Sequence, residues 1–377
     1  MDFGLTESQQ MLKASVQSFA KNKVDKKFVR EMERHPEGYT DDLWRSLADL
    51  GWLRLPFPET YSGDGQDFVT LCALLEEMGR TLVPGPYLTS VVLCGQAIAE
   101  FGSEDQKRRF LPAIGNGKEV VVLAHIEPNV QEGPDGIQLT VMPQDSGYVL
   151  NGVKLFVPYA NSAKTLLVSA RQPVGAAGAS GVCYFLVSLK TRGVAITRLH
   201  TISKEPQYEI DFTDVVVPAS AALGQLGKGQ EIERRIAQWG AVAACALMSG
   251  AAQSMLDLTV DYVKARVAFG RPIGSFQAIQ HHCANMTVDV ESCKAVTYNA
   301  AWYVSERLPA DMHVATAKGW VSDALRRVYS LAHQCHGAMG LATEYDLQLY
   351  SRRCKAWEML FGDHNYQQHR VGQLLGF

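Results

Sequence analysis

The spacing of apolar residues divides the 377-residue chain into three stretches. From residue 1 to about 118, apolar side chains recur at steps of three and four, the period of amphipathic helices. From about 119 to 224, runs rich in Val, Ile, Phe and Tyr alternate with Gly, Pro, Asn and Asp, which predicts strands joined by turns. From about 225 to 377 the helical period returns in long runs. We therefore predict an α+β protein with an N-terminal helical domain (1–118), a small central β-domain (119–224) and a C-terminal four-helix bundle (225–377).

The individual elements follow from the same pattern. Ser103 caps a helix that we expect to end near Pro112, and Asn151-Gly152 predicts a tight hairpin turn in the β-domain. The predicted strands cover residues 120–123, 147–150, 165–170, 182–189 and 209–217. The predicted long helices cover residues 232–266, 276–307, 311–336 and 345–371.

The composition narrows the class of protein. Hydrophobic residues make up 47% of the chain, so a large core can form, and a net charge of −3 provides no basic surface for nucleic acid. We find no apolar run long enough to span a bilayer and no secretory signal at the start. The eight cysteines form no C-x-x-C pair, which indicates no metal site and favours a reduced, cytoplasmic protein.

Candidate chemistry centres on residues 266–280, between the first two long helices. We expect Gly270 to end one helix and Ser275 to cap the next, so an ordinary helical corner would explain the spacing. Arg266, Phe269 and Gln277 change this interpretation. With Gln280 one turn further on, a guanidinium, an aromatic ring and two amides around one corner suit a cofactor that carries phosphates and flat rings.

A second candidate is the run Q-C-H-G-A-M-G-L over residues 334–341. Gln334 offers an amide, and Gly337 allows a ligand to approach the backbone closely. Taken alone, the run is more typical of a helix that ends at a glycine cap. We interpret His336 as a polar packing residue.

Both motifs resemble the acyl-CoA dehydrogenase family, whose patterns are R-x-x-F-G-x-x-I-x-x-F-Q-x-x-Q and Q-x-x-G-G-x-G-Y; Ala338 replaces the second glycine of the latter. The order of helices, strands and helices matches the family over the whole chain. The resemblance implies FAD as cofactor, an acyl-CoA substrate and an electron-transferring flavoprotein as acceptor. It also implies a central β-barrel or β-sandwich. Arg266 and Phe269 would reach FAD held mainly by a neighbouring subunit, and residues 334–338 would touch its diphosphate and ribityl part.

The β-domain departs from the family pattern at two motifs. T-E-P-G-A-G-S-D is replaced by I-E-P-N-V-Q-E from Ile126 to Glu132, which keeps only the Glu-Pro pair. W-I-T-N, whose Thr donates a hydrogen bond to flavin N5, is replaced by F-V-P-Y from Phe156 to Tyr159. Phe156 can still cover the flavin ring, but Pro158 offers neither a hydroxyl nor an N–H.

The catalytic base is the largest departure. The family removes the α-proton with a Glu on one of two segments, and both matching positions are glycine, Gly362 and Gly240. Asp363 is our first candidate for a replacement base, although it could equally cap a turn. The other candidates are Glu358 and Glu233, and we interpret Glu233 as a solvated charge. His364, in the same run, is grouped with the cofactor contacts.

Three functions remain open. The first is an FAD-dependent acyl-CoA dehydrogenase acting in lipid degradation, on fatty, dicarboxylic or steroid acyl-CoAs. The second is a non-catalytic subunit of a heteromeric dehydrogenase. The region around F-G-D resembles a branch that includes small subunits of pimeloyl-CoA dehydrogenase and subunits of steroid side-chain enzymes, and these often work as mixed pairs. A flavin monooxygenase on the same fold is the third. We accordingly expect a homo-oligomer, dimer or tetramer, or a heterotetramer with a second chain of this family.

Overall fold

The computed structural model describes residues 4–128, 133–145, 147–172 and 181–377. Its backbone forms two compact units, which we describe separately. The bundle unit comprises Met1–Arg30, Asp67–Val83 and Ala241–Phe377. The sheet unit comprises Glu31–Gln66 and Pro84–Gly240.

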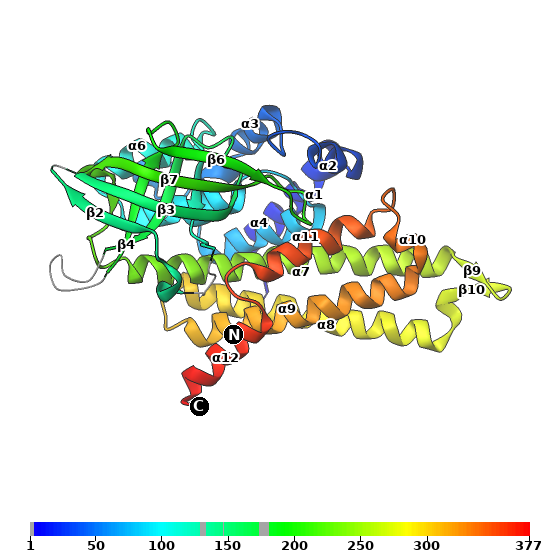
Figure 1. Cartoon of the computed structure of the whole chain (residues 1–377). Helices are drawn as coiled ribbons and strands as arrows, with labels where there is room; N and C mark the ends of the chain where they lie inside the picture. The colour runs from blue at the N-terminus through cyan, green and yellow to red at the C-terminus, as the bar shows by residue number, and fades with distance from the viewer. Residues whose placement is uncertain (1–3, 129–132, 146, 173–180) are drawn as a thin grey trace. The chain divides into compact units, whose positions relative to one another are not determined.

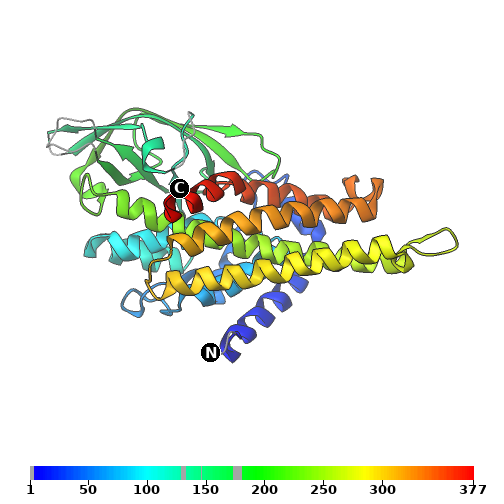
Figure 2. The ribbon, with the colours of Figure 1, turned by 90° about the horizontal axis from the view of Figure 1, so that it is seen from below.

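The bundle unit is built on long helices that run side by side, with α7, α8, α9 and α11 visible together in Figures 1 and 2. The helices of this unit are α1 (Glu7–Lys23), α2 (Lys26–Met32), α4 (Phe68–Thr81), α7 (Gln230–Ala265), α8 (Gln277–Ser305), α9 (Asp311–His336), α10 (Ala338–Leu341), α11 (Leu347–Met359) and α12 (His364–Leu375). Two of them are shared with the sheet unit, to which α2 belongs from Glu31 onward and α7 belongs up to Gly240. The predicted helix over 311–336 is confirmed, whereas the one over 345–371 divides into α11 and α12. Phe361 and Gly362 cause the division, because their φ angles of 56° and 86° interrupt the right-handed helix.

The corner after α7 differs from its prediction. The helix ends at Ala265, and Gly270 lies further on, in the turn of a hairpin between β9 (Val267–Ala268) and β10 (Arg271–Pro272). Both turn residues, Phe269 and Gly270, have positive φ, as tight hairpins require. Ser275 ends the short 3₁₀ turn η6 (Ile273–Ser275) and donates its hydroxyl to the carbonyl of Pro272, so it does not cap α8.

The sheet unit holds one eight-stranded sheet in the order β6-β7-β3-β2-β4-β5-β8, with β1 paired in parallel to β4. The strands are β1 (Val121–Ala124), β2 (Thr140–Gln144), β3 (Gly147–Pro158), β4 (Thr165–Arg171), β5 (Val182–Ser188), β6 (Val194–Leu199), β7 (Gln207–Pro218) and β8 (Ala222–Leu223). The helical elements beside them are α3 (Asp41–Asp49), α5 (Gln96–Phe101), α6 (Glu104–Gly115) and the π-helix η3 (Leu88–Gly95); the short 3₁₀ turns are η1 (Trp52–Arg54), η2 (Glu59–Tyr61), η4 (Pro134–Gly136) and η5 (Ala219–Ala221). The order of N-terminal helices, sheet and C-terminal helices agrees with the prediction.

Two sequence signals in this unit were misleading. Strand β3 continues through Asn151-Gly152 instead of turning back, with a shift in its register against β7 at this point. The Asn151 side chain exchanges hydrogen bonds with Asp214 of β7, at 2.8 and 3.2 Å, which keeps the irregular segment within the sheet. Pro112 does not end α6, which continues to Gly115; the carbonyl of the exposed Arg108, four residues earlier, loses only a helical partner that water can replace.

Helix α7 is long and apolar enough to cross a membrane, with a mean hydropathy of 1.3 over its most apolar window. Within the described residues, 83% of that window is buried inside the protein. The prediction that no apolar run reaches this length was therefore wrong. The burial of α7 is that of a core helix.

Helices α4 and α7 cross in backbone contact inside the bundle unit. A Cβ atom at Gly250 would lie 1.7 Å from the carbonyl oxygen of Glu76, and one at Gly79 would lie 2.0 Å from that of Leu247. Real side chains do not approach a carbonyl so closely, so both helices depend on glycine at the crossing.

We predict that Gly250→Ala destabilises the protein by about 1–3 kcal/mol or more, because α4 and α7 must separate to admit the methyl group. Gly372→Ala in α12 is the matched control. Nothing lies within 4 Å of its added Cβ, so alanine should be neutral there or stabilise by about 0.5–1 kcal/mol. Urea unfolding curves of the two variants measure both effects, and equal midpoints would contradict the assignment of the crossing.

Candidate functional site

The hairpin after α7 presents the first set of predicted cofactor residues to solvent. Arg266 directly precedes β9 and is exposed, and the Phe269 side chain in the turn is 94% exposed. The Phe269 ring forms an edge-to-face contact with Phe276, at 6.1 Å between ring centroids. Gln277, the first residue of α8, is also exposed. An aromatic ring left so open suits contact with a ligand or another subunit.

The second set lies at the C-terminal end of α9. Gln334, Gly337 and Ala338 are exposed there. Gly337 has φ 60°, and nothing lies within 4 Å of a Cβ built at this position. The backbone is therefore open to close approach by a ligand.

His336 joins the two sets. Its ring stacks on Tyr262 of α7 with centroids 4.3 Å apart, so the end of α7 and the end of α9 belong to one end of the bundle unit (Figure 1). Its Nδ1 lies 2.8 Å from the carbonyl oxygen of Ala332. Burial lowers the pKa of His336, which favours the neutral ring in this stack. The predicted packing role of His336 agrees with this environment.

The chemistry of these residues fits a dinucleotide. A guanidinium suits a diphosphate, an exposed ring and planar amides suit flat heterocycles, and an open glycine allows phosphate oxygens near the backbone. Sequence analysis found each of these residues but did not foresee the contact between His336 and Tyr262, which links the two motifs.

In the sheet unit, the predicted flavin-facing residues lie beside one another. The amide of Leu155 donates to the carbonyl of Ile126 at 2.8 Å, which places Phe156 next to Ile126. Phe156 has φ 52° at a second register shift of β3, and its ring is 42% exposed. Pro158 pairs with Gln207 and supplies no donor. The substituted residues Asn129–Glu132 lie outside the described part of the chain.

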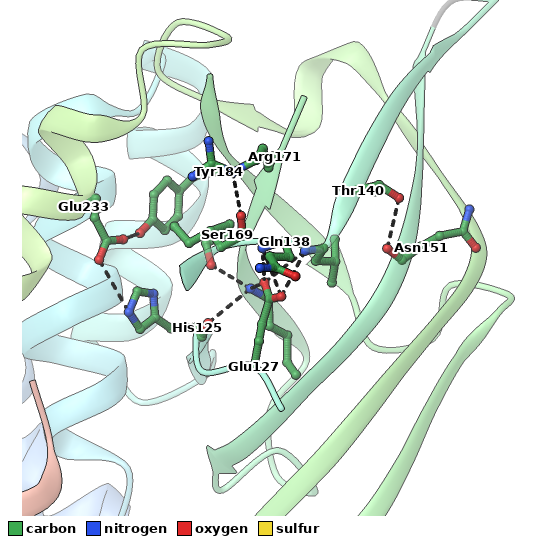
Figure 3. Close-up of polar contacts among 12 residues, drawn as sticks. His125, Glu127, Gln138, Thr140, Asn151, Ser169, Arg171, Tyr184 and Glu233 are labelled. Atoms are coloured by element: carbon green, nitrogen blue, oxygen red, sulfur yellow. Dashed lines mark hydrogen bonds and ion pairs between the residues drawn. The ribbon is translucent and has the colours of Figure 1, made fainter. Parts of the chain in front are cut away.

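The surviving Glu127 is held in a buried network (Figure 3). Its carboxylate accepts from the amides of Gln138 and Leu139 at 3.0–3.1 Å and from the ammonium of Lys154 at 2.6 Å. Lys154 also donates to Ser169 Oγ at 2.8 Å. Burial lowers the pKa of Lys154 to about 8, against the opposing effect of Glu127. This network anchors the segment that leads to Ile126.

Glu233 belongs to the same region, and the prediction that it is a solvated charge was wrong. It is 3% exposed, and its carboxylate lies 3.4 Å from Nε2 of His125 and accepts the hydroxyl proton of Tyr184 (Figure 3). Helix position alone suggested solvent, but strand β5 and the segment after β1 supply buried partners. Both carboxylate oxygens are engaged, so Glu233 is tied to structure.

The connector between α11 and α12, residues 360–363, holds the position where the family carries its base. Gly362 has no side chain, and a Cβ at this position would lie 2.1 Å from Cδ1 of Tyr366. The tyrosine ring thus occupies the space that a longer side chain would enter. Gly240, the other position, is buried within α7. No local pattern in the sequence indicates this position of the Tyr366 ring.

The remaining carboxylates near the connector have structural partners. Asp363 is the N-cap of α12, where its Oδ1 accepts from the amide of Tyr366 at 3.0 Å. Glu358 is buried in α11 and lies 3.2 Å from Nζ of Lys355. His364 contacts the carbonyl of Gly319 through Nδ1 at 2.9 Å, so this nitrogen faces α9.

Lys318 fixes the connector from α9. Its side chain is fully buried, and the ammonium donates to the carbonyls of Glu358 at 2.7 Å and Gly362 at 2.9 Å and to Ser322 Oγ at 3.1 Å. Gln367 adds a 2.6 Å bond to the carbonyl of Phe361. The carbonyls of Glu358, Phe361 and Gly362 are therefore held by side chains of α9 or α12.

The chain is similar over its whole length to acyl-CoA dehydrogenases. Residues 6–118 match the family described as acyl-CoA dehydrogenase, N-terminal domain, and residues 227–375 match acyl-CoA dehydrogenase, C-terminal domain. The short-chain specific acyl-CoA dehydrogenase of Megasphaera elsdenii is 31% identical over 386 residues, which cover 100% of both proteins.

Solved structures give the same result. The ChsE4–ChsE5 complex from Mycobacterium tuberculosis contains a chain that is 29% identical, with a TM-score of 0.91 over 100% of this chain and 99% of that one. A structure described as an FAD-dependent dehydrogenase is 26% identical, with a TM-score of 0.89 and 100% of both chains covered.

We predict that Lys154→Met destabilises the protein by about 3–5 kcal/mol, because the buried carboxylate of Glu127 keeps two amide donors but loses its cation. Removing both charges, as Glu127→Gln with Lys154→Met, should recover part of this loss. Lys164→Met is the control, since the exposed Lys164 ammonium bonds only a backbone carbonyl in the contacts described here. Urea unfolding measures all three, and a Lys154→Met variant as stable as the control would contradict the network.

Proposed function

Because the chain belongs to the acyl-CoA dehydrogenase family, we propose that it is one subunit of an FAD-dependent enzyme that desaturates acyl-CoA thioesters, with the catalytic base supplied by a second chain. The α-proton of the thioester must be taken by a group within about 2.6–3.2 Å. Gly362 and Gly240 cannot do this.

One observation carries the proposal: the Tyr366 ring lies against Gly362. If only the base had been replaced, the space for its side chain would remain. Here the space is filled, and Lys318 and Gln367 hold the connector in this form. The filled space next to Gly362 supports the proposal that this chain does not remove the α-proton.

The residues that fit the cofactor are retained. FAD, when bound, accepts the hydride that leaves the β-carbon. Arg266 would bind its phosphates and Phe269 would cover a ring, while the open backbone at Gly337 admits the diphosphate. Phe156 beside Ile126 offers an apolar cover for the flavin, and Pro158 leaves N5 without the usual donor. The other proposed contacts are Gln277, Gln334, Ala338 and His364.

We propose a heterotetramer with a second chain of this family as the functional assembly, and an electron-transferring flavoprotein as the acceptor. The similarity to a chain from a complex of two differently named subunits supports the mixed pairing. A homo-oligomer is the alternative assembly. We propose a cytoplasmic location, because the cysteines are free thiols, seven of them buried. The acyl group belongs to the fatty, dicarboxylic or steroid classes.

A second candidate is a self-sufficient dehydrogenase in which Asp363 removes the proton. Its proximity to Gly362 favours it, but its Oδ1 accepts from the α12 amide of Tyr366. Asp363→Asn separates the two roles, because Asn caps helices as well as Asp does but cannot act as a base. In a self-sufficient enzyme this variant should reduce flavin about 10²–10⁴-fold more slowly.

We predict that the chain alone shows no bleaching of the flavin absorbance when acyl-CoAs are added without oxygen. Gly362→Glu alone should not create activity, because Tyr366 blocks the side chain and a non-glycine residue at φ 86° is strained. Gly362→Glu combined with Tyr366→Ala removes the steric block and keeps only the backbone strain, so it should give slow but measurable flavin reduction. Tyr366→Ala alone is the control. Bleaching by the unmodified chain that Asp363→Asn abolishes would contradict the proposal.

We also predict that Arg266→Ala weakens FAD binding about 10- to 100-fold, the effect of losing a charged hydrogen bond of about 1.5–3 kcal/mol. Arg271→Ala is the matched control in the same hairpin, where the guanidinium lies over the Phe276 ring at 4.2 Å. FAD content per chain after gel filtration measures the difference. Equal retention in both variants would show that Arg266 does not contact the cofactor.

A further inference from the structure

The loop between α9 and α11, residues 337–346, carries the cofactor residues Gly337 and Ala338 but has little packing of its own. Met339 and Leu341 in α10 are largely exposed, at 49% and 72%. Such a segment keeps one conformation only if its ends are tied to the rest of the unit.

Arg30, on α2 near the N-terminus, ties down the far end of this loop. Its NH2 group donates to the carbonyl of Glu344 at 2.7 Å and to Oδ1 of Asp346 at 2.7 Å. Nε points to the carbonyl of Thr343 at 3.4 Å, and NH1 bonds the carbonyl of Lys26 at 3.2 Å. One guanidinium thus contacts three residues of the loop, Thr343, Glu344 and Asp346. The planar fork of guanidinium donors allows this pattern, and an ammonium does not.

Helix α2 is a fixed platform for this contact. The ammonium of Lys26 donates to the carbonyl of Thr81 in α4 at 3.0 Å and lies over the Tyr350 ring of α11 at 4.7 Å. Arg30 therefore connects the loop to elements that are themselves packed in the bundle unit.

The near end of the loop follows His336, whose ring is stacked on Tyr262 of α7. At the far end, Tyr345 lies 5.2 Å from the His336 ring and 6.4 Å from Tyr262. Residues 337–341 therefore bridge His336 and the far end that Arg30 clamps. Release of Arg30 would remove the clamp on Thr343, Glu344 and Asp346.

We propose that Arg30 is a positioning residue for the cofactor: by clamping Thr343–Asp346 it holds Gly337–Leu341 in the conformation that receives the diphosphate. This inference rests on the proposed function for the identity of the ligand. The clamp itself is a property of the chain without the cofactor.

Hydrogen exchange of the full chain without FAD tests the clamp. Arg30→Ala should speed exchange of the amides in 337–346 by about tenfold, while α7 and α9 stay protected. Arg30→Lys should give an intermediate rate, because its ammonium cannot serve all three acceptors. Arg370→Ala is the matched control, since Arg370 forms a similarly exposed ion pair with Asp311 at 3.2 Å in the same unit.

FAD affinity tests the positioning role. It is measured by flavin fluorescence on the chain alone or, if the chain alone does not retain FAD, on its complex with the partner chain. If the loop is correctly placed only a tenth to a third of the time, Arg30→Ala should raise the Kd about 3- to 10-fold. Unchanged exchange in 337–346, equal acceleration in Arg370→Ala, or a loosened loop with unchanged FAD affinity would each overturn the inference. Normal FAD binding in Arg266→Ala would instead count against the proposed function. The hydrogen-exchange measurement would still decide whether Arg30 clamps the loop.

Discussion

The buried ammonium of Lys318 is the constraint on which the functional interpretation depends. A buried ammonium must donate its hydrogen bonds to protein acceptors, because water does not reach it. Lys318 donates to Ser322 Oγ and to the carbonyls of Glu358 and Gly362. The Gly362 carbonyl belongs to the connector, where Phe361 and Gly362 adopt left-handed backbone conformations. The connector is followed by α12, which starts at His364, and in the first turn of that helix the Tyr366 ring lies against Gly362.

It follows that the missing base is part of a coherent arrangement. The connector is hydrogen-bonded to Lys318 and Gln367, its Gly362 has a positive φ and lies against the Tyr366 ring, and Asp363 caps the N-terminus of α12. The residues that we propose to contact the cofactor show the opposite trend, since Arg266, Phe269 and Gln334 remain exposed at one end of the bundle unit. A subunit that binds cofactor and leaves proton removal to another chain accounts for both observations.

The sequence predicted the regular parts of the structure well and the strained parts poorly. Helix α9 runs over the predicted residues because its apolar period is unbroken, while β2 and β6 were not predicted because most of their residues are exposed and leave little apolar alternation. Motif residues such as Arg266 and Gly337 could be found because local patterns carry them. Lys318, Tyr366 and Arg30 could not, because their roles arise from contacts with a connector or loop that propensity does not describe, and the Arg30 contact spans 316 residues.

The central claim is that this chain has no base positioned to remove the α-proton of an acyl-CoA. The most direct measurement is exchange of that proton with solvent, because it reports proton removal even when no hydride is transferred. The purified chain is incubated with acyl-CoAs in D₂O, and deuterium at the α-carbon is measured by mass spectrometry. The account predicts incorporation no faster than in buffer for the chain alone, and faster incorporation when a base-carrying partner chain is added. Rapid incorporation by the chain alone would contradict it.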